Sequence, residues 1–190
     1  MITHLIKSIN WIDVAVFALF VWIVFVAVKN GFISELFKFL GVVVAVFVSL
    51  HYYSSWAAWL ARKTHLTWSC WDLLVFAGLW FAVALFFKFI RNGILVLFKV
   101  ETNHQGFDKY AAGVVGVARG ILVSSMVIFL VLLVHYGPMT RMAFRSYSFK
   151  ISGHAAVGTY SFLYNHLVDK LFMGEHYNAA AGKEILNPKP

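Results

Sequence analysis

Two ionisable residues, Glu35 and Arg119, stand where the chain is otherwise apolar. Arg119 interrupts an uncharged stretch from 110 to 136, and Glu35 precedes a second apolar segment, three residues before Lys38. A charged group inside a membrane is costly and marks an ion pathway, a proton relay or a buried pair. If the two segments pack together, Glu35 is the obvious partner of Arg119. The alternative is a purely structural pair or a side chain that extends to the membrane surface. Asp13 is expected simply to favour a helix N-terminus.

Histidine and cysteine show no catalytic pattern. The eight histidines lack metal-ligand spacing, and Cys70 is the single cysteine, which excludes an intramolecular disulfide. His51 and His135 end two apolar segments on the same side, which suits axial haem ligation across a bundle; the alternative is a pair of ordinary interfacial histidines. The sequence has no nucleophile elbow, P-loop or dinucleotide-binding fingerprint. It predicts no enzyme, no cofactor and no metal site.

Small residues recur at four-residue spacing in two of the apolar segments. One stripe holds Gly41, Ala45 and Ser49, and the other holds Ala112, Gly116, Gly120 and Ser124. In lipid, such stripes let two helix backbones approach closely. They predict that the second and fourth segments pack against each other, or against copies of the chain in a homo-oligomer. The alternative is that glycine and alanine are simply common in membrane helices.

The elements that must position these residues are membrane-spanning helices. Of 190 residues, 61% are hydrophobic and 13% charged, and the mean hydropathy is +0.77, which excludes a soluble monomer. The net charge of +8 comes from basic residues between apolar runs, so it indicates contact with the lipid bilayer rather than with nucleic acid. Runs without charge predict an all-α protein whose domain 1–140 crosses the membrane four times, at about 11–30, 34–56, 70–90 and 112–136.

The first and third spans resemble copies of one unit. Asp13 is followed sixteen residues later by Lys29, and Asp72 by Lys88 at the same spacing, which suggests a parallel two-helix repeat. Basic residues on the two sides are nearly balanced, so they do not fix the orientation. Aromatic anchors gather on the side of the termini: Trp11, Tyr52, Tyr53, Trp56, Trp59, Trp68, Trp71 and Tyr136. We expect both termini to be periplasmic.

The chain changes character after Pro138. Apolar residues recur at helical spacing between polar ones from Val157 to Phe172, and Arg141, Arg145 and Lys150 precede them. This predicts that 141–178 forms an amphipathic helix in the membrane interface, with packing of that helix on the ends of the bundle as the alternative. Residues 179–190 are expected to be disordered.

Three short motifs resemble the CvpA family, the bacterial colicin V production proteins. They are Asn10-Trp11-Ile12-Asp13, then Gly31-Phe32 with Glu35, and then Asp108-Lys109 followed by Gly116 and Arg119-Gly120. The departures are Ala27 and Ala112 at usual glycine positions and Lys109 for the usual arginine. The positions shared with the family are Asp13, Gly31, Phe32, Glu35, Gly41, Asp108, Gly116, Arg119 and Gly120.

The resemblance implies a multi-span inner-membrane protein associated with production or export of the toxin colicin V and with envelope homeostasis. Two functions then stay open. The first is an accessory or scaffold protein with an envelope or secretion protein as its partner. The second is a small oligomeric channel or transporter that uses Glu35 and Arg119. Four helices alone enclose little room for a pore, so the second function requires an oligomer.

Overall fold

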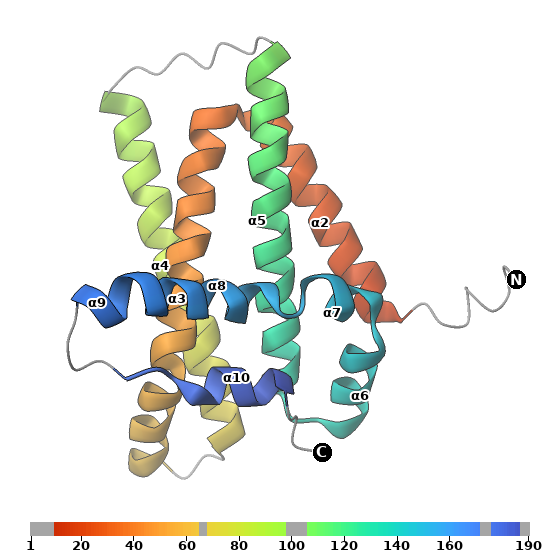
Figure 1. Ribbon diagram of the computed structural model, residues 1–190, viewed down its shortest axis with the longest axis vertical. Coiled ribbons are helices and arrows are strands. Elements are labelled where there is room, and N and C mark those ends of the chain that lie inside the picture. Colours follow the sequence, from red (N-terminus) through yellow and green to blue (C-terminus); the bar gives the residue numbers. More distant parts are fainter. Residues whose placement is uncertain (1–9, 65–67, 98–105, 172–175, 187–190) are drawn as a thin grey trace, which may run out of the picture.

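The computed structural model describes residues 10–64, 68–97, 106–171 and 176–186, and every element in them is a helix (Figure 1). Four helices are long and apolar enough to cross a membrane, so the predicted all-α membrane fold is confirmed. They are α2 (Trp11–Asn30), α3 (Phe32–Lys63), α4 (Trp68–Leu97) and α5 (Gly106–Leu133). α3 and α4 extend beyond the predicted spans at both ends, whereas α5 begins six residues earlier and ends three residues earlier than the predicted 112–136.

The long helices lie in the order α4, α3, α5, α2. α3 packs against α4 on one side and α5 on the other, and α2 packs mainly against α5. Each first helix of the suspected repeat thus packs on the second helix of the other unit: α2 on α5, and α4 on α3. The α3–α5 contact lies between these two pairs.

The second and fourth spans, α3 and α5, pack against each other as predicted, but the glycines of the two stripes face other helices. A Cβ on Gly41 would lie 2.9 Å from Phe87 of α4, and a Cβ on Gly120 would lie 2.8 Å from Phe20 of α2. A Cβ on Gly116 would overlap the Cβ of Ala27, also in α2. These glycines therefore face the first helix of the other unit, Gly41 and Gly120 against a phenylalanine ring and Gly116 against Ala27.

The segment after α5 is not the single interfacial helix predicted for 141–178. It folds into short helices that lie across α3 and α5 (Figure 1). Ser146 and Gly153 separate three of them, and Ser146 Oγ accepts a hydrogen bond from Phe149 N at 3.1 Å. Ala156, Tyr160 and Tyr164 are buried against the bundle. The structure therefore agrees better with the alternative that this segment packs on the bundle, although it contacts the side of the bundle and not its end. The elements are α6 (Gly137–Arg145), α7 (Tyr147–Ser152), α8 (Ala155–Leu163), one π-helical turn η1 (Tyr164–Val168) and α9 (Asp169–Leu171).

The prediction of disorder from residue 179 is wrong for Ala179–Leu186, which form α10. Alanine has the strongest helix propensity, and Ala181 is fully buried in the core. Asn178 fixes the start of this helix: its Oδ1 accepts from Ala180 N, and its Nδ2 donates to Leu50 O of α3 at 2.7 Å. Residues 187–190 lie outside the described part.

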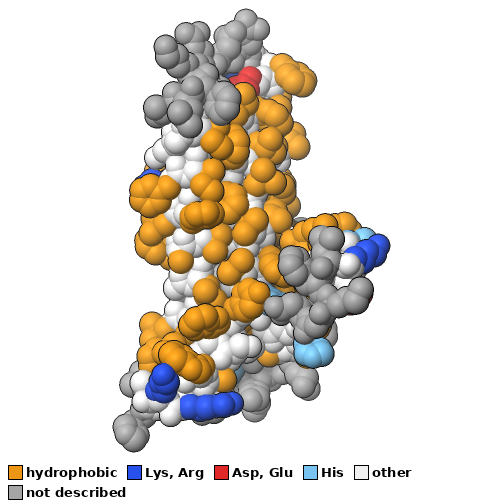
Figure 2. Space-filling model, turned by 90° about the vertical axis from the view of Figure 1, so that its left-hand side faces the viewer, with side chains coloured by type: hydrophobic (Ala, Val, Ile, Leu, Met, Phe, Trp, Pro, Cys, Tyr) orange, Lys and Arg blue, Asp and Glu red, His pale blue; other side chains and the backbone are white. Residues whose placement is uncertain are grey.

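The tail bonds to α2, α3 and α5 at a similar height along the bundle. Asp13, His51 and Ser125 each bond to the tail, and the α2–α3 turn with Asp108 marks the opposite end. From these contacts to that end, α2, α3 and α5 each rise about 26–29 Å at roughly 1.5 Å per residue. This matches a hydrocarbon layer of about 30 Å. Apolar side chains cover the α4 side of the bundle over this length, as expected for a lipid-facing helix (Figure 2).

Candidate functional site

The turn between α2 and α3 places Glu35 inside the bundle. Gly31 has φ 76°, a backbone conformation that favours glycine, and it lets α3 begin at once after α2. Phe32 N donates to Asp108 Oδ1 at 3.0 Å, so the first turn of α3 is capped by a side chain of α5. Glu35 follows in that turn and is 0% exposed.

Glu35 is the centre of a three-residue charge cluster. Arg119 Nη1 lies 2.8 Å from Glu35 Oε1, and Lys38 Nζ lies 3.1 Å from Glu35 Oε2. The pairing of Arg119 with Glu35 expected from the sequence is therefore present. The Oε1 contact is an ion pair by distance and not a well-aligned hydrogen bond, since Oε1 has no hydrogen-bond donor of good geometry. Arg119 Nη2 also donates to Ile23 O of α2 at 3.4 Å, so one cluster joins α2, α3 and α5.

Arg119 lies deeper than a span-end residue. Because α5 begins at Gly106, Arg119 follows thirteen residues of helix, and its backbone is about 16 Å from the level of Asp108 at roughly 1.5 Å per residue. The side chain is 8% exposed, and Nε is buried without a hydrogen-bond partner. Arg119 thus reaches upward to Glu35 from near the middle of the membrane-crossing region.

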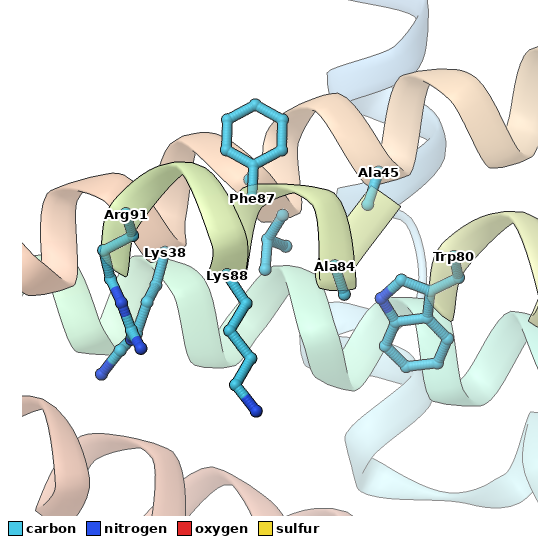
Figure 3. Close-up of a pocket in the computed structure, with 9 residues that line it drawn as sticks. Lys38, Ala45, Trp80, Ala84, Phe87, Lys88 and Arg91 are labelled. Carbon is cyan, nitrogen blue, oxygen red and sulfur yellow. The ribbon is translucent and has the colours of Figure 1, made fainter. Parts of the chain in front are cut away.

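Two adjacent cavities open beside this cluster. The first, about 300 Å³, lies between α3 and α4, and Lys38, Lys88 and Arg91 are its cationic lining residues. Figure 3 shows the nitrogen-bearing ends of these three side chains pointing to the same side of α4. The second, about 690 Å³, is an apolar groove between α2 and α4 with Arg119 in its wall. The two share Val42, Trp80 and Ala84, so the basic end continues into the apolar groove.

Comparison with known protein families shows which family the chain belongs to. The family model of the colicin V production protein matches residues 12–157. The chain belongs to the colicin V production protein family. No match was found among curated proteins or solved structures. The matched region contains all four long helices, the charge cluster and the tail as far as the first turn of α8, so the family match and the four apolar helices together describe a multi-pass membrane protein of the colicin V production type.

Asp13 and Asp108 of this colicin V production family protein act as backbone acceptors. Asp13 Oδ1 accepts from Ser148 N at 2.8 Å, which ties α2 to α7, and Asp108 ties α5 to α3 as described above. Neither carboxylate forms a salt bridge within the described residues. The two residues therefore connect helices, whereas Glu35 and Arg119 carry the buried charge.

The predicted packing residues divide by neighbour. Gly41 and Ala45 line the first cavity beside α4, and Ser124 lines a separate pocket between α2 and α7. Ala112 is fully buried in α5. Ser49 is also fully buried. The hydroxyl oxygens of Ser49 and Ser124 lack a hydrogen-bond partner.

The two histidines considered for haem are held by separate partners. His51 Nδ1 lies 3.0 Å from Tyr160 OH of α8, and His135 Nδ1 lies 2.7 Å from Leu133 O of its own segment. His51 is therefore part of the contact between the tail and α3. In the described part of the chain, no three His, Cys, Asp or Glu side chains gather as a metal site.

Sequence reasoning missed the residues that attach the tail. Ser125 Oγ donates to Gly153 O at 3.0 Å and accepts from Ala156 N at 2.9 Å. Tyr160 OH contacts His51 and accepts from Asn178 N at 2.9 Å. The signals available in the sequence were Ser125 within an apolar segment and Asn178 before three alanines. The spacing of neither residue identifies the group to which it bonds.

Proposed function

We propose that this protein is a non-enzymatic accessory or scaffold protein of the bacterial inner membrane that supports production or export of colicin V and envelope homeostasis. The observation that supports the proposal is that charged residues of the membrane helices pair with groups of the same chain. Glu35 is paired with both Arg119 and Lys38, and Asp13 and Asp108 cap neighbouring segments. Charges that hold helices together are what a scaffold needs, whereas a conduit needs charges that face a permeating solute.

The tail is the surface we assign to a partner from the envelope or the secretion machinery. Its inner face is fixed on the bundle, while Tyr147, Ile151 and Phe162 are exposed. A photo-crosslinking residue at Phe162 should capture a specific protein from intact membranes, and the same residue at the α4 position Phe86 serves as the control. Equal capture at both positions would remove the tail from the proposal.

Colicin V release tests the accessory role directly. Producing cells that lack the protein are complemented with Glu35→Gln, with Arg119→Leu, or with both changes. A scaffold predicts that the double variant recovers the release that Glu35→Gln loses, because Arg119 is then no longer buried without its carboxylate. Failure of the double variant to recover release, with normal amounts in the membrane, would contradict the proposal.

A channel or transporter is the second candidate, and the groove of about 690 Å³ with Arg119 in its wall favours it. In an oligomer, a second copy could close this groove on its lipid side. Purified protein in liposomes distinguishes the two functions: selective ion or solute flux supports the conduit, and flux no greater than in protein-free liposomes supports the scaffold.

For orientation we propose periplasmic termini, and a reporter fused after Pro190 that is active only in the cytoplasm should be silent.

A further inference from the structure

We propose that the two adjacent cavities form a binding site for one anionic phospholipid. The phosphate occupies the basic end at Lys38, Lys88 and Arg91, and an acyl chain lies in the apolar groove between α2 and α4. This inference does not depend on the accessory role proposed above, since either a scaffold or a conduit can hold a lipid.

The charge balance of the basic end favours an anion. Lys38, Lys88 and Arg91 line one cavity, Arg119 lines the next, and no carboxylate lines either cavity in the described part of the chain. The charged ends of Lys38, Lys88 and Arg91 point to the same side of α4 (Figure 3). Glu35 balances part of this charge behind the cavity wall. An excess of cations between membrane helices attracts the phosphate of an anionic lipid headgroup.

Arg119 gives a second, independent observation. Its side chain lines the apolar groove, is 8% exposed, and leaves Nε buried with no hydrogen-bond partner. A buried donor without a partner is unfavourable, and an ester or phosphate oxygen in the groove would accept its hydrogen bond. The groove therefore contains a polar group that a polar atom of the lipid would satisfy.

The shape of the site fits a lipid better than a free phosphate. The cavities share Val42, Trp80 and Ala84. The acyl chain of a lipid whose headgroup lies at the basic end can therefore enter the apolar groove directly. Lys38 lies six residues after the start of α3, about 9 Å into the crossing region at roughly 1.5 Å per residue, where a lysine can still reach the headgroup layer. The groove volume of about 690 Å³ is in the range of ligand pockets, roughly 300–1,000 Å³.

The test measures lipid retained by the purified full-length protein, using native mass spectrometry after incubation with dioleoyl phosphatidylglycerol or dioleoyl phosphatidylethanolamine. We expect at least about tenfold more phosphatidylglycerol bound, and about a tenfold loss in the variant Lys88→Gln/Arg91→Gln. The control, Lys29→Gln/Lys109→Gln, removes the same charge from exposed residues that do not line either cavity. Equal retention of the two lipids, or equal losses in both variants, would overturn the proposal.

A second pair of variants leaves the charge unchanged. Ala84→Trp fills the junction of the two cavities, whereas Ala82→Trp adds the same side chain to an exposed position of α4 outside them. Loss of lipid with Ala84→Trp alone supports the proposal. If inorganic phosphate displaces the lipid while Ala84→Trp has no effect, the site binds phosphate only, and the lipid proposal is wrong. A dimer without bound lipid would show that a second copy fills the groove, and this would also overturn it.

Discussion

Replacing Glu35 with glutamine removes the carboxylate that Arg119 and Lys38 share. Arg119 is 8% exposed and cannot easily regain water, so its charge stays buried without a partner. Breaking a buried ion pair in this way costs about 3–5 kcal/mol. The Lys38 side chain is 19% exposed and can move toward the surface, so most of the loss comes from Arg119.

The reverse change should cost less. In Arg119→Leu, Glu35 keeps the Lys38 ammonium at 3.1 Å, so the carboxylate is not left alone, and leucine preserves much of the apolar contact with α2. We expect a loss of roughly 1–3 kcal/mol, the cost of leaving one buried polar atom, Glu35 Oε1, without a partner. The double variant Glu35→Gln/Arg119→Leu contains neither buried charge and should be more stable than Glu35→Gln alone.

Reversible unfolding in mixed detergent micelles measures these differences. The double-mutant cycle should give a coupling free energy of at least about 2 kcal/mol between the two positions. Lys109→Gln, an exposed change on the same helix as Arg119, is the control and should have no measurable effect. If the two single changes cost the same and simply add in the double variant, the shared-carboxylate explanation is wrong.

Three further predictions concern packing and the tail. Gly116→Ala should destabilise the protein by about 1–3 kcal/mol because its Cβ overlaps α2, whereas Gly113→Ala, whose Cβ meets its neighbour at 3.5 Å, should be tolerated; the same unfolding assay checks both. Tyr160→Phe should speed hydrogen exchange in α10, with the exposed Tyr147→Phe as the unchanged control. Ser125→Ala should speed exchange at the start of α8, since it removes two hydrogen bonds between α5 and the tail; unaltered exchange would contradict this attachment.

Charge spacing predicted the pairing of Arg119 with Glu35 because few alternatives exist for a cation in an apolar helix. The small-residue stripes were less informative. Gly41 and Gly116 specify that something approaches closely, but Phe87 and Ala27 of other helices fill those gaps. A stripe encodes the shape of one surface, and the identity of the opposite surface depends on the arrangement of all four helices, which spacing within one helix does not contain.

The position of the tail was harder to predict because its apolar face could be buried either against lipid or against protein. A helix with buried Ala156, Tyr160 and Tyr164 shows the same periodicity whether that face meets lipid or protein. The polar contacts decide between them, since Tyr160 OH and Asn178 bond to α3 and to each other. Tyr160 and Asn178 are more than a hundred residues in sequence from the α3 residues to which they bond, so no local pattern pairs them.

The length of α3 shows why an uncharged run does not define a span. No charged residue occurs between Lys38 and Arg62, so the sequence suggests membrane throughout. From the start of α3 to His51, which contacts the tail, the helix already rises about 29 Å at roughly 1.5 Å per residue, the thickness of one hydrocarbon layer. Trp56 lies about 8 Å and Trp59 about 12 Å beyond that level at roughly 1.5 Å per residue. Both are exposed, and indole rings favour the headgroup layer. The last turns of α3, beside α10, therefore extend beyond one hydrocarbon thickness, as their exposed indole rings also indicate.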